Sequence, residues 1–196
     1  YANAGASADA APIVGVTYYV STSGNDASAG TSAMPFKTIA KCISKASSGD
    51  TCIVNAGTYN ESFNISKSGI TLQTNGKVIT KRIAITGNNN TVRGFTVTDP
   101  NANNGFQVEG NFNLIENNEI YHTKQDGIWF FGHDNTFRGN YIHDILDPSV
   151  ANQYPTYDEH ADCFQTWDWA WDTYNVLFEN NICDHNRDEG SNQIFM

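Results

Sequence analysis

Apolar residues return at a regular interval through the second half of the chain. Four segments have apolar ends and a polar middle rich in Gly and Asn; they are 91–97, 114–120, 136–142 and 177–183. Their third positions are 23, 22 and 41 residues apart and hold Arg93, Glu116, Arg138 and Glu179. Such self-similarity, with short alternating strands and no helical period, is typical of a β-solenoid, in which each coil buries its inward side chains against the next. The pattern predicts an all-β fold, a right-handed parallel β-helix.

The alignment of these copies also predicts which side chains stack. The inward positions form two columns, Val92, Ile115, Phe137 and Phe178 in the first and Val97, Ile120, Ile142 and Cys183 in the second. A third column holds Asn118, Asn140 and Asn181. Asn tolerates the left-handed geometry of a turn and can bond its copies in the neighbouring coils. A second strand is expected after each copy, at 105–108, 127–130, 163–166 and 192–195.

The first part of the chain has a different pattern, which predicts a cap. Residues 1–16 are small and low in complexity, typical of a flexible arm or linker, or of the mature end left after a signal peptide is removed. A strand is expected at 17–21, followed by apolar residues spaced for one face of a short helix, at Phe36, Ile39, Ile43 and Ala46. We therefore expect one domain over 17–196, with a cap at 17–59, coils at 60–196 and an inserted loop at 146–160.

The segment from Tyr18 to Tyr59 resembles the N-terminal cap of secreted pectate-lyase-like β-helix proteins. It combines the first strand, the short helix, the strand 51–55 and the closing Gly57-Thr58-Tyr59. The resemblance implies that the helix plugs the first coil, whose open end would otherwise expose the core and unpaired strand edges. Together with the Ala-rich start, it favours a secreted or cell-surface protein.

Charge and hydropathy disfavour several classes of partner. The formal net charge is −10, which argues against binding to nucleic acid or to an anionic membrane surface. An anionic partner would need a cation between it and the protein. No apolar run reaches the roughly 18 to 20 residues that span a bilayer. N-glycosylation sequons begin at Asn60, Asn64 and Asn89, and they too fit an exported protein.

The cysteines fall into two pairs of different character. Cys42 on the expected helix and Cys52 on the following strand are ten residues apart, and we expect them to form a disulfide across the turn between them. Cys183 falls in an inward column and Cys163 at a corner, so their pairing is less favoured, and buried free thiols are the alternative. The C-x-x-C spacing of zinc sites is absent.

Candidate chemistry gathers where the repeat is interrupted. The insertion at 146–160 leads into His160-Ala-Asp-Cys-Phe-Gln165, and a long loop in a regular solenoid is usually functional. Exposed indoles beside amides and carboxylates suit sugar rings. The candidate substrate-binding residues are therefore Trp129, Gln165, Trp167, Trp169 and Trp171. The alternative is that the alternating tryptophans pack a wide coil.

Aspartates near the corners suggest a metal. Asp126 and Asp162 align one coil apart, which in a parallel solenoid is about 5 Å. Two carboxylates that close repel each other unless they share a proton or a cation, and their hard oxygens suit Ca²⁺. The calcium candidates are Asp126, Asp144, Asp162 and Asp188. The alternative is that they are solvated turn residues, because Asp is favoured in turns.

The motifs Asn140-Tyr-Ile-His-Asp144 and His160-Ala-Asp-Cys-Phe-Gln165 resemble those of bacterial β-helix proteins that act on or bind polysaccharides. Two reactions stay open. A lyase would use Ca²⁺ on Asp126, Asp144 and Asp162 to bind a uronate carboxylate, and a base would remove the adjacent C5 proton. The candidate bases are His160, His143 and Arg187. A hydrolase would instead use two carboxylates, drawn from Asp144, Asp162, Asp184 and Glu189.

A structural role is the second class of function. The sequence stops at Met196 within an expected strand, and an uncapped apolar end of a solenoid is an association surface. Either more coils follow or another subunit covers the end. End-to-end contacts that do not close would build an adhesive or structural filament.

Overall fold

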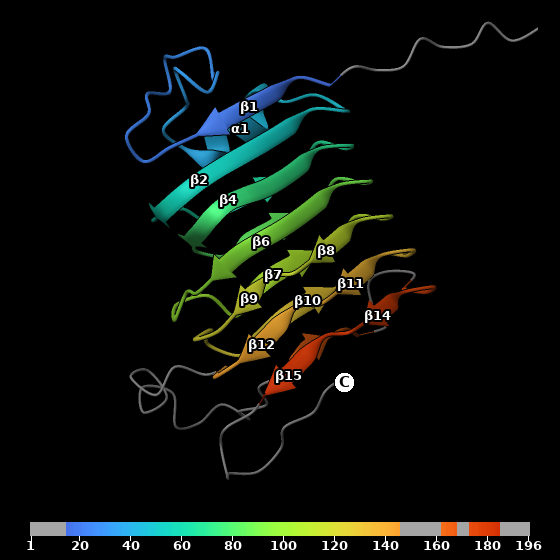
Figure 1. Ribbon diagram of the computed structural model, residues 1–196. Helices are drawn as coiled ribbons and strands as arrows, with labels where there is room; N and C mark the ends of the chain where they lie inside the picture. Colours follow the sequence, from blue (N-terminus) through green and yellow to red (C-terminus); the bar gives the residue numbers. More distant parts are fainter. Residues whose placement is uncertain (1–14, 146–161, 168–172, 185–196) are drawn as a thin grey trace, which may run out of the picture.

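Successive coils of the chain stack along one axis in the computed structural model of this protein (Figure 1). The structure describes residues 15–145, 162–167 and 173–184. Within these ranges, the paired strands run parallel from the first coil to the last. The predicted all-β parallel β-helix is therefore confirmed. The arm up to residue 14, most of the inserted loop and the strand expected at 192–195 lie outside the described residues.

The larger of the two sheets, sheet A, contains ten of the described strands. In chain order these are β1 (Thr17–Val20), β2 (Thr51–Tyr59), β4 (Thr71–Thr80), β6 (Thr91–Val97), β8 (Leu114–Glu116), β9 (Glu119–Ile120), β11 (Thr136–Arg138), β12 (Tyr141–His143), β14 (Leu177–Glu179) and β15 (Ile182–Asp184). In the coils after β6 the chain bends within sheet A, so that β8 and β9, β11 and β12, and β14 and β15 take the place of one longer strand.

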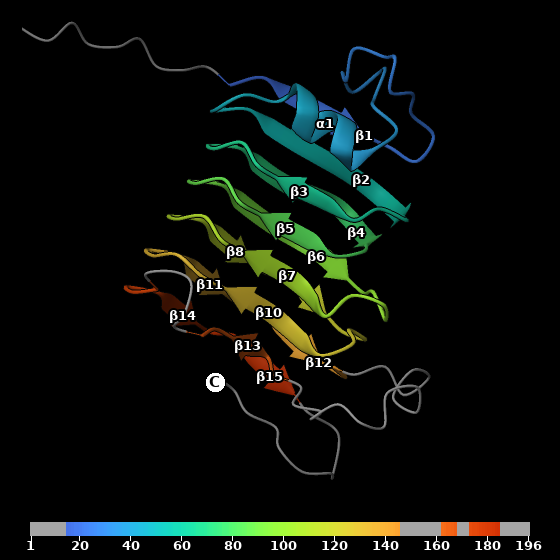
Figure 2. The ribbon, with the colours of Figure 1, turned by 180° about the vertical axis from the view of Figure 1, so that it is seen from behind.

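The smaller sheet, sheet B, contains five of the described strands and faces the viewer in Figure 2. They are β3 (Phe63–Ile65), β5 (Ile83–Ile85), β7 (Asn104–Val108), β10 (Asp126–Phe130) and β13 (Phe164–Gln165). Each coil passes from sheet B to sheet A through one corner and returns through another. Residues at equal positions in the repeat therefore line up across the coils.

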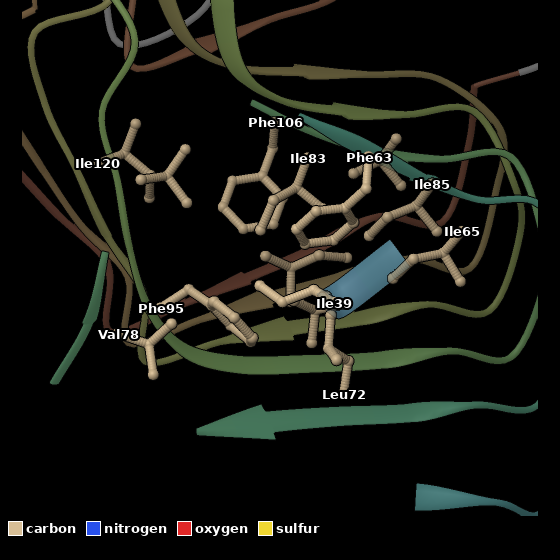
Figure 3. Close-up of a cluster of buried hydrophobic side chains, with 14 of the residues drawn as sticks. Ile39, Phe63, Ile65, Leu72, Val78, Ile83, Ile85, Phe95, Phe106 and Ile120 are labelled. Carbon is tan, nitrogen blue, oxygen red and sulfur yellow. The ribbon is translucent and has the colours of Figure 1, made fainter. Parts of the chain in front are cut away.

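The hydrophobic core fills the space between the two sheets. Figure 3 shows Phe106 and Ile83 of sheet B opposite Phe95 and Leu72 of sheet A. Both predicted inward columns are confirmed by the strand register, since Ile115 pairs with Val92 and Phe137, and Ile142 pairs with Ile120 and Cys183; the remaining neighbours follow the same order. Full burial of each such apolar side chain contributes about 1.5–3 kcal/mol, so the core stabilises every coil against its neighbours.

The predicted asparagine ladder is also present. Asn140 Oδ1 accepts hydrogen bonds from the backbone N and the Nδ2 of Asn118, at 3.1 and 3.0 Å. Asn181 Oδ1 accepts the same two bonds from Asn140, both at 3.0 Å. One expectation was wrong, because the left-handed residue is the one before each ladder position; these are Gly94, Asn117, Gly139 and Asn180. The ladder Asn satisfies backbone groups that this sharp bend frees.

A second asparagine ladder occupies the corner that leads from sheet B to sheet A, and sequence reasoning missed it. Asn90 N donates to Asn113 Oδ1 at 2.9 Å, and Asn113 N donates to Asn135 Oδ1 at 2.8 Å. These three side chains are at most 1% exposed. Their spacing of 23 and 22 residues equals that of the first ladder, and this was the available signal.

The cap forms at the N-terminal end of the solenoid, as predicted. Helix α1 (Ile39–Lys45) buries Ile39, Cys42 and Ile43 against the first coils. Thr38 Oγ1 accepts from Lys41 N at 3.1 Å, and the carboxylate of Glu61 accepts from Ile39 N and Ala40 N, which satisfies the free N–H groups of the first turn. The expected Cys42–Cys52 disulfide is present. In the part of the chain that the structure describes, no helix is long and apolar enough to cross a membrane.

Cys163 and Cys183 also form a disulfide, so the less favoured of the two alternatives is the one present. Cys163 occupies the register position of Gly127, which pairs one coil earlier with Gly105. A Cβ placed on Gly105 would meet Ile120, and one on Gly127 would meet Ile142. The position therefore points into the core at the second inward column. In the last described coil that column holds Cys183, which the Cys163 thiol reaches.

The solvent face of sheet A carries a ladder of alternating charge. It consists of Arg93, Glu116, Arg138 and Glu179, one residue in each successive coil. Glu116 lies 3.3 Å from Arg93 and 3.8 Å from Arg138, and Arg138 Nε donates to Glu179 at 2.6 Å. Each exposed pair contributes little, about 0–1 kcal/mol, but opposite signs meet at every step.

Candidate functional site

Asp126 and Asp162 lie side by side in adjacent coils of sheet B. The register pairs Ile128 with Phe164, and this places the two aspartates in one column. Asp162 N donates to Asp126 Oδ1 at 2.9 Å. The two residues are 1% and 0% exposed, respectively. The predicted alignment is thus confirmed, and the burial argues against the alternative that these are solvated turn residues.

Asp126 also fixes the orientation of the first candidate tryptophan. Trp129 Nε1 donates to Asp126 Oδ2 at 2.5 Å, so each oxygen of this carboxylate accepts a hydrogen bond. The Trp129 ring meets Trp167 edge to face, with centroids 5.1 Å apart, and Trp167 meets Phe131 in the same way at 5.2 Å. Both indoles are partly exposed. The structure therefore brings two of the four candidate tryptophans together beside the carboxylates.

Gln165 lies next to Trp129 on the outer side of sheet B. The two residues pair in register across β10 and β13. Gln165 is 6% exposed, and its Nε2 donates to the Thr166 carbonyl at 3.3 Å. Among the described residues, its Oε1 has no hydrogen-bond partner. An acceptor that is buried and unpaired is suited to a ligand hydroxyl or a bound water.

Sequence reasoning missed a cation on this face, Arg82. Its Nε donates to Asn104 Oδ1 at 2.9 Å, and one terminal nitrogen bonds Gln107 Oε1. Burial lowers the pKa of Arg82, while the carboxylates of Glu109 and Asp99 act in the opposite direction. Asn104 pairs in register with Asp126, so Arg82 contacts the column of buried polar residues to which the aspartates belong. In the sequence, the available signal for Arg82 was its position directly before the apolar alternation of β5.

His143 and Asp144 are placed elsewhere, at the end of β12 in sheet A. His143 Nδ1 lies 2.8 Å from Asp144 Oδ2, and its Nε2 lies 3.5 Å from Glu119 Oε1. The imidazole stacks on Tyr141, with centroids 4.2 Å apart. Asp144 is exposed and has φ 44°, as expected for a turn residue. These two candidates therefore form a cluster of their own on the other sheet.

Asp184, a candidate carboxylate for the hydrolase reaction, lies on β15 and pairs in register with His143. The other candidates with a catalytic, metal or sugar-binding role lie outside the described residues; they are His160, Trp169, Trp171, Arg187, Asp188 and Glu189. Asn60, Asn64 and Asn89 are all exposed, and glycosylation at these positions stays a prediction.

The aspartate pair offers oxygen donors of the kind that calcium sites use. Carboxylate oxygens are the ligands that Ca²⁺ prefers, and Asp126 and Asp162 supply them from neighbouring coils. Among the described residues, no three His, Cys, Asp or Glu side chains form a group that could hold a metal ion. Asp144 therefore does not join the pair. The donor chemistry fits calcium, and further oxygens would have to complete the shell.

The chain matches a family with the same architecture. Residues 18–194 match the family described as Pel9A-like, right handed beta helix region. A curated relative, the uncharacterized protein YwoF of Bacillus subtilis (strain 168), is 42% identical over 64 residues, which are 33% of this chain and 13% of that protein.

Two solved structures share the fold. Pectate lyase Pel9A superimposes with a TM-score of 0.67 and 20% identity, over 84% of this chain and 46% of that one. A rhamnogalacturonan lyase gives a TM-score of 0.57 and 18% identity, over 91% of this chain and 60% of that one. The chain spans less than two thirds of the length of each of these proteins.

Proposed function

The chain belongs to the family of Pel9A-like right-handed β-helix regions, and we propose that it forms part of a secreted enzyme that cleaves an acidic polysaccharide by β-elimination. The observation that carries this proposal is the pair of buried carboxylates, Asp126 and Asp162, beside the indoles of Trp129 and Trp167. The names of the solved neighbours, a pectate lyase and a rhamnogalacturonan lyase, support the reaction class. Two disulfides support secretion, because they persist in oxidising compartments.

The aromatic pair and the amide oxygen of Gln165 would bind the sugar. Partly exposed indoles offer an apolar face to the C–H groups of a pyranose ring. Trp129 is held by Asp126, so the face is fixed before the ligand arrives, which lowers the entropic cost of binding. Gln165 Oε1 would accept a hydrogen bond from a sugar hydroxyl.

Charge explains why a cation belongs in the proposal. The chain has a net charge of −10, and an acidic polysaccharide would meet two carboxylates at the site. Ca²⁺ held by Asp126 and Asp162 would neutralise this repulsion and bind the uronate carboxylate, which makes the adjacent C5–H more acidic.

The reaction needs a base and a leaving group. A base takes the C5 proton, the electron pair of that bond becomes the C4–C5 double bond, and the C4–O bond to the next sugar breaks. The departing oxygen keeps the electron pair of the C4–O bond and then takes a proton. We assign the base to His160, two residues before Asp162, because a neutral imidazole accepts a proton near neutral pH.

The test is to incubate the protein with polygalacturonate, rhamnogalacturonan or alginate, with calcium or with a chelator. We expect new ultraviolet absorbance from the double bond on one of these substrates, and its loss with the chelator. Asp162→Asn should reduce the rate by at least about 100-fold, since it removes one charge without changing the volume of the side chain. Glu179→Gln is the matched control, because this carboxylate lies on the outer face of sheet A.

Two results would contradict the proposal. New reducing ends without the double bond would indicate hydrolysis instead of elimination. An unchanged rate for Asp162→Asn would remove the carboxylate pair from the mechanism.

A further inference from the structure

One corner of the β-helix, between sheet B and sheet A, is built from residues in the left-handed conformation. The register aligns six of them, each two residues before a strand of sheet A. They are Gly49, Gly69, Asn89, Phe112, Asp134 and Asn175, with φ of 91°, 77°, 56°, 58°, 56° and 51°. Gly, Asn and Asp are the residues that adopt this conformation readily. Phe112 is therefore the exception in its column.

The fold does not require a phenylalanine at this position, because Gly, Asn or Asp occupies it in the other described coils. A bulky side chain at positive φ is strained, and such strain persists where function requires it. Burial in the core would offset the cost, but Phe112 is 52% exposed. The neighbouring coils show that Asn or Asp serves this corner without strain.

The rings around Phe112 belong to the next two coils. Phe112 meets His133 edge to face, with centroids 5.3 Å apart, and His133 stacks on Tyr174 at 4.6 Å with nearly parallel planes. Tyr174 is 55% exposed. We call these three side chains the corner platform.

Polar groups hold the platform in place and line its edge. Asp134 Oδ2 lies 2.6 Å from His133 Nδ1, and Asn175 Nδ2 donates to the other oxygen of Asp134. The hydrogen bonds from His133 and Asn175 lower the pKa of Asp134, so this carboxylate is charged at neutral pH. The surface thus combines apolar rings with acceptors and donors, as sugar-binding surfaces do.

The corner platform is continuous with the candidate site. Trp167, which contacts Trp129, also covers Phe131, and Phe131 is two residues from His133. The four-residue step from Trp129 to His133 spans at most about 14 Å. An extended sugar chain bound beside Trp129 would therefore reach the corner within a few rings.

We propose that Phe112, His133 and Tyr174 form a second carbohydrate-binding site, onto which a polysaccharide chain extends from the aspartate pair. The faces of pyranose rings stack on the exposed aromatic groups, and sugar hydroxyls bond Asp134 and Asn175. The identity of the ligand rests on the proposed function. The role of the strained Phe112 is to bind carbohydrate, not to stabilise the fold.

The test compares Phe112→Asn and Tyr174→Ala with the parent protein. Affinity electrophoresis in gels with polygalacturonate, rhamnogalacturonan or alginate gives dissociation constants, and thermal unfolding gives Tm. For Phe112→Asn we expect affinity for the polymer to fall about three- to tenfold while Tm rises by about 2–4 °C, because Asn relieves the strain. Tyr174→Ala should weaken binding to a similar extent. Met34→Asn, at a 54% exposed apolar residue in the N-terminal loop, is the matched control and should leave the affinity unchanged.

The outcomes separate this inference from the proposed function. If the parent binds a polymer and Phe112→Asn binds it equally well, the corner platform is refuted and the proposed function is not. A lower Tm for Phe112→Asn would show that the side chain serves stability, and loss of self-association in this variant would show that the platform contacts a second copy; either result overturns the proposal. If the parent binds none of the three polymers, both the platform's ligand and the proposed function fail.

Discussion

Replacement of Asn140 by Ala should remove much of the stability of the β-helix. The Asn140 side chain accepts from the N and Nδ2 of Asn118, and it donates to the Ile115 carbonyl at 2.9 Å and to Asn181 Oδ1 at 3.0 Å. Asn140 is 0% exposed, so water does not replace these partners freely. The ladder should therefore act as a structural element with a measurable cost of removal.

The magnitude follows from the groups that lose their partners. Asn140→Ala removes the acceptor of Asn118 N, a donor to the Ile115 carbonyl and one of the two acceptors of Asn118 Nδ2, which still donates to the Val92 carbonyl. A buried group left without a partner costs about 1–3 kcal/mol. Because the surroundings relax in part, we expect a loss of about 3–5 kcal/mol in the free energy of unfolding. This is a large share of the total for a domain, about 5–15 kcal/mol.

The assay is urea unfolding followed by circular dichroism, with Asn117→Gly as the matched control. Asn117 is exposed and left-handed with φ 54°, and the next coil has Gly139 at its position, so this change should shift stability by no more than about 0.5 kcal/mol. A loss of less than about 1 kcal/mol for Asn140→Ala would refute the reasoning, since it would mean that water satisfies the freed groups.

Two further predictions concern the last described coil and the cap. Replacing Cys163 and Cys183 together by Ser should lower the free energy of unfolding by about 3 kcal/mol, because the disulfide closes a loop with a sequence separation of 20 residues; an unchanged urea midpoint would contradict this. Burial raises the pKa of Asp26, but hydrogen bonds from Thr38 and Lys37 outweigh it and lower the pKa below the model-peptide value of 3.8. The contribution of Asp26 to the free energy of unfolding is therefore complete above pH 3.8 and is lost as the pH falls through the lower pKa of the folded state. Asp26→Asn should make the free energy of unfolding less dependent on pH only below pH 3.8. An unchanged pH dependence in that acidic range would show that these hydrogen bonds do not matter.

The strand register could be predicted from the sequence because parallel coils place equal positions of the repeat in line. Ile115 and Phe137 are 22 residues apart and pair directly, so the period alone gives the contact. The same logic placed Asp126 beside Asp162. The period can be read from the sequence alone, and in a solenoid the residues one period apart become neighbours in adjacent coils.

The errors arose where a side chain's direction depends on the bend of the backbone. Cys163 was assigned to a corner, although its column contains Gly105 and Gly127, which have no side chain to show that it points inward. The strain at Phe112 was likewise invisible, because a phenylalanine in an aromatic-rich sequence gives no sign of its φ angle. Comparison with the Asn and Gly residues one period away would have revealed the inward direction of Cys163 and the left-handed conformation of Phe112.

The location of the candidate site was predicted in part. Trp129 and Gln165 lie near the aspartate pair because they pair across sheet B, and Trp167, two residues after β13, contacts Trp129. Asp144 was expected to join this pair as a calcium ligand, and His143 was a candidate base beside it. They lie instead on sheet A, since the chain turns a corner between them and Asp162.

The charge ladder on sheet A makes successive coils alternate between positive and negative charge at one position. Arg93, Glu116, Arg138 and Glu179 alternate in sign, so deletion or duplication of a single coil would place like charges against each other. Loss or gain of two coils would restore the alternation. The outer surface of the solenoid thus distinguishes odd from even coils where its core does not.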